Sequence, residues 1–87
     1  MKKYKKILMY TKIPCPFCVA ARHFFENHNI PFTEIDLTHD VDQLIAIKQK
    51  WGWSTVPIIL VEDELIGGYT DLKALYDKGL LESIILQ

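Results

Sequence analysis

Cysteine is scarce in this sequence, which has only Cys15 and Cys18 among its 87 residues. A secreted disulfide scaffold of this size normally carries four or more cysteines. The count therefore favours a reducing compartment, and we expect a cytoplasmic protein. Long apolar runs are also absent: no stretch approaches the roughly 18 residues of a membrane span, and the apolar run at residues 7–9 is too short for a signal peptide.

An excess of charge of either sign is missing as well. The chain has 10 Lys and Arg against 11 Asp and Glu, for a formal net charge of -1. This balance gives no general electrostatic reason to bind nucleic acid or an acidic membrane, so we expect neither partner. The length fits one domain spanning residues 1–87, and we expect it to act as a monomer.

The hydrophobic pattern predicts strands and helices in a βαβ unit, a helix, a β-hairpin and final helices. The strand patterns lie at residues 4–10, 32–37, 57–61 and 65–66. The helix patterns lie at residues 17–29, from a cap at Asp40 or Asp42 to about Gly52, from a cap at Thr70 or Asp71 to Gly79, and at residues 80–85. This order indicates an α/β fold with one four-stranded mixed sheet flanked by helices. Apolar residues at helical spacing are assigned to the core: Phe24, Phe25, Leu72, Leu75, Ile84 and Ile85.

The segment Cys15-Pro16-Phe17-Cys18 carries the strongest chemical signal. Two intervening residues at the start of a helix allow both sulfurs to join in a reversible disulfide. The first sulfur faces the free N–H groups and the positive end of the helix dipole, which favours thiolate over thiol, so we expect Cys15 to be the nucleophile. Lys12, three residues upstream, is either a further positive charge near that sulfur or an exposed residue at a strand end.

A zinc site is the alternative interpretation of a cysteine pair. Zinc usually takes four ligands, and the sequence has no second pair. The other soft candidates are His23, His28 and His39, of which the first two are five residues apart and do not share a helix face at i,i+4 spacing. We therefore expect no bound metal and assign the histidines to the surface.

Two further motifs lie in the second half of the chain. In Thr55-Val56-Pro57, the proline removes a backbone donor and leaves neighbouring groups free to pair with an extended substrate, although the residue could also simply begin a strand. In Gly67-Gly68-Tyr69-Thr70-Asp71, a close backbone approach precedes a helix N-terminus, which suits a carboxylate, although such a turn could also simply end a strand.

Taken together in this order and spacing, Lys12, the cysteine pair and the two later motifs resemble those of dithiol glutaredoxins over nearly the whole chain. The resemblance implies a thioredoxin-like fold, a cis proline beside the cysteine pair, no bound cofactor, and glutathione as co-substrate. It also implies that Cys15 attacks disulfide-containing or glutathionylated proteins, that Cys18 resolves mixed disulfides with them, and that glutathione restores the dithiol.

The resemblance further places the cysteinyl part of glutathione along the backbone of Val56, the γ-glutamyl carboxylate near Tyr69 and Thr70, and the glycine carboxylate near Lys12. The glutathione-binding residues that it implies are Lys12, Phe17, Thr55, Val56, Pro57, Gly68, Tyr69 and Thr70.

The chain departs from the family at several of these positions. Phe17 stands where tyrosine is usual, and Trp53 and Ser54 stand where a basic residue is common. Leu44 takes the place of a Gln or Arg aimed at the glycine carboxylate, which leaves Lys48 or Lys50 as substitutes. We assign at least one of Trp51 and Trp53 to packing, and the other could contact a protein partner.

Three other functions stay open at the level of sequence. The first is a thioredoxin-like redoxin that a flavoprotein reductase reduces. The second is an iron–sulfur carrier with a glutathione-ligated cluster on Cys15, which the stiffness of Pro16 disfavours. The third is an interaction module whose cysteine pair only switches its binding surface.

Overall fold

The computed structural model describes residues 2–87, which form strands and helices in the predicted order. The strands are β1 (Ile7–Thr11), β2 (Thr33–Asp36), β3 (Ile58–Val61) and β4 (Glu64–Gly67). The helices are α1 (Pro16–Asn27), α2 (Val41–Trp51), α3 (Tyr69–Asp77) and α4 (Leu81–Ile85). None of the helices in this part of the chain combines enough length and apolarity to cross a membrane.

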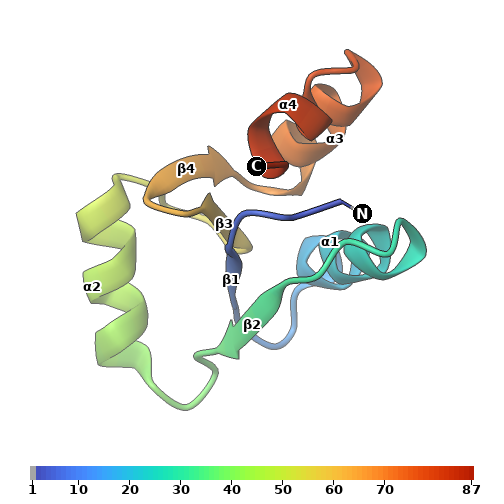
Figure 1. Cartoon of the computed structure of the whole chain (residues 1–87). Coiled ribbons are helices and arrows are strands. Elements are labelled where there is room, and N and C mark those ends of the chain that lie inside the picture. Colours follow the sequence, from blue (N-terminus) through green and yellow to red (C-terminus); the bar gives the residue numbers. More distant parts are fainter. Residues whose placement is uncertain (1) are drawn as a thin grey trace.

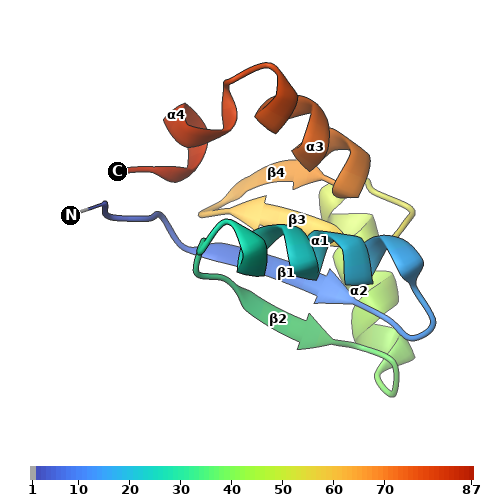
Figure 2. The same cartoon turned by 90° about the vertical axis from the view of Figure 1, so that its right-hand side faces the viewer.

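The four strands form one mixed sheet in the order β2-β1-β3-β4 (Figure 2). β1 runs parallel to β2, as the βαβ unit requires, and antiparallel to β3, while β3 and β4 form the predicted hairpin. In the centre of the sheet Met9 lies opposite Ile59. The expected four-stranded mixed sheet is therefore confirmed.

Helices cover both faces of the sheet, which explains why β3 is apolar without alternation (Figure 1). Because side chains alternate along a strand, Ile59 and Val61 pack with α1, α3 and α4, whereas Ile58 and Leu60 pack on the side of α2. Among the predicted core residues, four are buried and two are partly buried against the same cluster: Phe24, Phe25, Leu72 and Ile85, then Leu75 and Ile84.

The helix α2 buries few of its side chains against the sheet. Leu44 is the buried residue of this helix, while Val41 and Ile45 are 56% and 49% exposed. The side chain of Asp40 accepts the N–H of Gln43 at 3.2 Å and begins the helix, and Gly52 ends it in the left-handed conformation. Of the two predicted caps, Asp40 is therefore the one that is used.

The start of α3 corrects the sequence analysis. Neither Thr70 nor Asp71 is the capping residue, because the N-cap is Gly68, two residues before Thr70, and the helix begins at Tyr69. Asp71 lies in the first turn, where its Oδ2 accepts the N–H of Gly68 at 2.9 Å. The carboxylate thus stabilises the helix start from inside the helix, as the second half of a capping box does.

The first strand is shorter than predicted, and its N-terminal part pairs with the end of the chain instead. Tyr4 forms an isolated bridge with Leu86, and the N–H of Lys5 donates to the carbonyl of Ile85 at 2.7 Å. Both ends of the described chain therefore lie side by side, at the end of the sheet opposite the start of α1 (Figure 2).

Candidate active site

Cys15 and Cys18 form a disulfide at the start of α1, with their Cα atoms 5.2 Å apart. Cys15 is the N-cap residue, and its Sγ accepts the backbone N–H of Cys18 at 3.0 Å. Cys18 is 2% exposed, whereas Cys15 is only partly buried. The two sulfurs therefore differ in access: a bulky reactant can approach Cys15 but not Cys18.

The loop before β3 lies against the disulfide. The carbonyl oxygen of Val56 is 3.6 Å from the Sγ of Cys15, and the Val56–Pro57 peptide bond is cis, as expected for the proline beside the cysteine pair. Ile13–Pro14 is also cis. Within residues 2–87, neither the N–H nor the C=O of Val56 makes a backbone hydrogen bond. The N–H is thus free, and the C=O has only the Cys15 Sγ beside it, so both groups can pair with an extended ligand, as at the edge of a sheet.

A groove opens next to this loop, with a volume of about 160 Å³. It is lined by Phe17, Trp53, Thr55, Val56, Pro57, Gly68, Tyr69, Thr70 and Asp71. The structure thus brings together, from three separate segments, every predicted glutathione-binding residue except Lys12. The aromatic rings of Phe17 and Tyr69 lie nearly parallel with their centroids 6.3 Å apart.

Lys12 lies outside this groove, in a second pocket of about 400 Å³ that Cys15 and Cys18 also line. Its side chain is exposed. The other wall of this pocket includes Ile13, which is 65% exposed, and Val19. Cys15 therefore lies between two hollows, one with the free Val56 backbone and one with a cationic rim.

Sequence reasoning missed a polar network beside the second pocket. Arg22 donates two hydrogen bonds of 2.7 Å to Glu34, which also accepts the hydroxyl of the buried Thr11 at 2.8 Å. The hydrogen bonds from Arg22 hold the pKa of Glu34 below its ordinary value, and the same pair raises the pKa of Arg22. No sequence signal pointed to this network, because its residues come from β1, α1 and β2 and form no motif.

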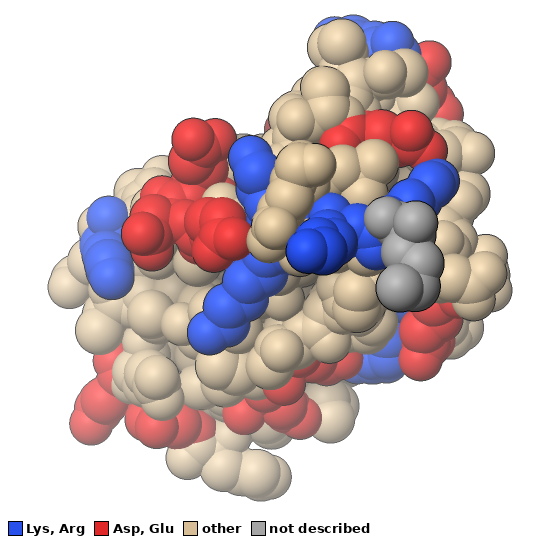
Figure 3. All heavy atoms as spheres, viewed as in Figure 1, with Lys and Arg blue, Asp and Glu red and all other residues tan. Residues whose placement is uncertain are grey.

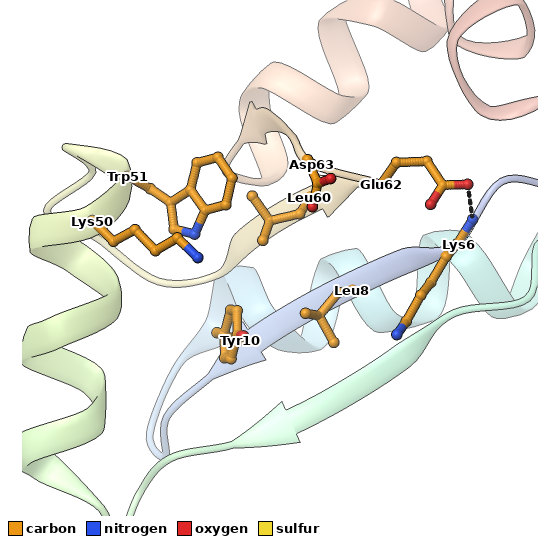
Figure 4. Close-up of a pocket in the computed structure, with 8 residues that line it drawn as sticks. All are labelled: Lys6, Leu8, Tyr10, Lys50, Trp51, Leu60, Glu62 and Asp63. Carbon is orange, nitrogen blue, oxygen red and sulfur yellow. Dashed lines mark hydrogen bonds between the residues drawn. The ribbon is translucent and has the colours of Figure 1, made fainter.

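The remaining candidates lie away from the groove. Leu44 is buried in the layer under α2, and Lys50 lies over Trp51 on the opposite face of the sheet from α1 (Figure 4). The three histidines are exposed, as predicted. Within residues 2–87, no three His, Cys, Asp or Glu side chains gather as ligands of a metal ion.

Comparison with known proteins agrees with this geometry. The family model described as Glutaredoxin matches residues 7–66. The chain belongs to the glutaredoxin family. Glutaredoxin 1 of Rickettsia prowazekii is 31% identical over 81 residues, which are 91% of this chain and 85% of that relative.

Solved structures of glutaredoxins also resemble the chain. Glutaredoxin 1 from Francisella tularensis is 38% identical with a TM-score of 0.71, and the match covers 86% of this chain and 95% of that one. A glutaredoxin from Brucella melitensis is 29% identical with a TM-score of 0.82, covering 94% and 89%. These similarities confirm the thioredoxin-like fold.

Family membership and the cysteine pair together define the activity. Glutaredoxins are thiol–disulfide oxidoreductases, and this chain carries the Cys15–Cys18 disulfide where α1 begins. It is a glutathione-dependent thiol–disulfide oxidoreductase, as the sequence predicted. Glutathione is therefore a substrate of this protein.

Proposed function

We propose that Cys15 is the nucleophile of this glutaredoxin and Cys18 the resolving thiol, and that glutathione binds in the groove along Val56. The difference in exposure between the two sulfurs carries the proposal. Once reduced, the accessible Cys15 sulfur still accepts the N–H of Cys18 and lies at the positive end of the helix dipole of α1. Both interactions favour its thiolate. The buried Cys18 sulfur can then act only on a bond that Cys15 has already formed.

With a glutathionylated protein, the Cys15 thiolate attacks the sulfur of glutathione and the protein thiolate leaves. The new bond joins Cys15 to glutathione. A second glutathione thiolate attacks the glutathione sulfur of this mixed disulfide, which releases oxidised glutathione and restores the Cys15 thiolate. This route does not need Cys18.

With a protein disulfide, Cys15 first forms a mixed disulfide with one protein sulfur, and the other protein sulfur leaves as a thiolate. Cys18 then attacks the Sγ of Cys15, which releases the reduced protein and closes the internal disulfide. Two glutathione molecules reduce that disulfide in turn. Both cysteines are needed on this route, and we propose disulfide-containing and glutathionylated proteins as the protein substrates.

The proposed position of glutathione follows from the free groups of the groove. The N–H and C=O of Val56 pair with the cysteinyl residue, next to the Sγ of Cys15. The N–H groups of Tyr69 and Thr70, in the first turn of α3, face the γ-glutamyl carboxylate. The N–H of Gly68 is already bonded to Asp71, so Gly68 contributes open space and not a donor.

Thr55, Pro57 and Phe17 form the walls of the groove in this proposal. Lys12 approaches the glycine end of glutathione from the neighbouring pocket and adds positive charge near Cys15. We also propose that the protein acts as a monomer in the cytoplasm without a bound cofactor. Acidic and basic side chains lie beside one another on the face in Figure 3, which is consistent with no preference for nucleic acid or an acidic membrane.

The experiment that tests this assignment measures reduction of a mixed disulfide between glutathione and a small thiol, with glutathione reductase recycling. Cys15→Ser should abolish turnover and Cys18→Ser should retain it. With a protein disulfide as substrate, both variants should be inactive. Failure of the wild type with glutathione, together with turnover by a flavoprotein reductase, would overturn the proposal.

A further inference from the structure

The indole N–H of Trp53 is a hydrogen-bond donor that the described residues leave without an acceptor. Trp53 lies in the loop between α2 and β3, and its ring lines the groove. Its Nε1 is buried and has no hydrogen-bond acceptor among the residues that the structure describes. Buried tryptophan N–H groups usually have an acceptor, because leaving such a donor unpaired is unfavourable. An unpaired donor in the wall of a binding groove suggests that its acceptor belongs to the ligand.

The position of this donor narrows the choice of ligand group. A Cβ built on Gly68 would lie 3.9 Å from the Nε1 of Trp53, so the indole N–H lies next to the start of α3. The ligand group expected there is an anion, since the first-turn N–H groups of α3 are directed to the same place. The Asp71 carboxylate, the protein's own anion at this point, is bonded to the N–H of Gly68.

We propose that Trp53 donates its Nε1–H to the γ-glutamyl carboxylate of bound glutathione and is a specificity-determining residue of this enzyme. The inference rests on the proposed position of glutathione in the groove. The side chain of Trp53 is only partly buried, but its Nε1 is shielded, so this hydrogen bond requires the ring to turn toward the ligand. The hydrogen-bond donor at this point is then a neutral indole, because neither Trp53 nor Ser54 is basic.

Trp51 provides an internal control, because it is the other tryptophan of the chain, packs against the same core cluster on the α2 side of the sheet, and lines a different pocket. Figure 4 shows its ring beside Leu60, in a pocket that includes Lys50 and Tyr10 and none of the groove residues. Its indole N–H should not respond to a ligand in the groove. Any general effect of the ligand on the protein would move both indole signals.

The first experiment observes the two indole N–H signals of ¹⁵N-labelled protein by NMR during titration with S-methylglutathione, which has no free thiol. The Trp53 signal should move downfield on saturation and its proton should exchange more slowly, while the Trp51 signal stays in place. Trp51→Phe assigns the two signals. A Trp53 signal that stays in place while the backbone amides of Val56 and Thr70 move would overturn the inference and leave the proposed function intact.

The second experiment compares Trp53→Phe with the matched control Trp51→Phe. Phenylalanine keeps an aromatic ring and removes the N–H. Trp53→Phe should raise the Kd for S-methylglutathione about tenfold, which equals about 1.4 kcal/mol, and should raise the KM for glutathione with kcat little changed. Trp51→Phe should change neither constant. Equal affinity of both variants, with thermal unfolding showing that both are folded, would contradict the inference.

A different result would count against the proposed function itself. If S-methylglutathione moves no groove amide in the wild type and the enzyme does not turn over with glutathione, both proposals fall together. If turnover is normal and only the Trp53 signal and the Trp53→Phe affinity are unaffected, this inference alone is wrong.

Discussion

Single residues buried between elements contribute to the stability of the fold in ways that no sequence motif reveals. Thr11 is one of these, since its side chain is buried and its hydroxyl donates a hydrogen bond to Glu34. Glu34 in turn holds Arg22 through two short hydrogen bonds. A partly buried, bidentate pair of this kind stabilises a fold more than an exposed ion pair, because solvent screens it less.

Glu34→Gln should lower the free energy of unfolding by about 1 kcal/mol at pH 7. The pKa of Glu34 in the folded protein lies below its ordinary value of 4.5, so the ionised form stabilises the native state. This contribution is complete above that value and is lost as the pH falls through the lowered native pKa. Urea unfolding of wild type and variant should therefore differ at pH 7 and converge in acid.

The exposed pair Lys73 and Asp77, on α3, is the control for this comparison. Asp77→Asn should leave the urea midpoint at pH 7 unchanged, because solvent screens both charges. If Glu34→Gln and Asp77→Asn shift the urea midpoint equally, the role given to the Arg22–Glu34 pair is wrong. The same holds if the loss of stability in Glu34→Gln grows as the pH falls.

Among the elements, the junction between β4 and α3 supplies one side of the groove. Gly67 has φ of +120°, in the region that favours glycine, and a Cβ there would lie 2.6 Å from the Oδ2 of Asp71. That same oxygen accepts the N–H of Gly68 and fixes the first turn of α3. Gly67 is thus required for close approach, so that a strand can turn at once into a helix whose N-terminus faces the groove.

Gly67→Ala should lower the free energy of unfolding by about 2–3 kcal/mol, from backbone strain plus displacement of Asp71. Gly52→Ala is the matched control, since Gly52 has φ of +61° and a Cβ there would meet nothing within 4 Å. Gly52→Ala should lower the free energy of unfolding by the backbone strain alone, about 1 kcal/mol. Chemical denaturation measures both, and equal losses would show that the contact with Asp71 is unimportant.

At the scale of the whole molecule, the cysteine pair and the ends of the described chain lie at opposite ends of the sheet. The disulfide lies where β1 leads into α1, and both ends of the described chain lie at the other end of the sheet (Figure 2). There α4 completes the larger core cluster with the buried residues Leu81 and Ile85. Stability and reactivity can therefore be changed separately at the two ends.

Ile85→Ala should lower the free energy of unfolding by about 2–4 kcal/mol, because it leaves a cavity in that cluster. Ile45→Ala removes the same atoms from a side chain on α2 that is 49% exposed, and it should cost less than about 0.5 kcal/mol. Thermal unfolding compares the two. Turnover per folded molecule should equal that of the wild type in both, and loss of turnover in folded Ile85→Ala would contradict the separation.

Sequence patterns predicted most of the elements, and the failures have local physical causes. The first strand began too early because Tyr4 is apolar and follows the strand pattern, but it pairs with Leu86 from the far end of the chain. The start of α3 differs from the predicted cap at Thr70 or Asp71 because the Asp71 carboxylate reaches back to Gly68 from inside the helix. Val41 and Ile45 fit the apolar pattern of α2, yet only one row of that helix meets the sheet.

The order of strands and helices, the disulfide pair at a helix start and the motifs of the glutaredoxin family follow from the sequence alone. These features depend on local preference and spacing, which neighbouring residues set. The folded structure was needed to show that Lys12 lies outside the groove that holds the other predicted residues and that the buried Nε1 of Trp53 has no partner among the described residues. It also showed that Thr11, Arg22 and Glu34 form one network. Such contacts join segments far apart in the chain, and packing fixes them.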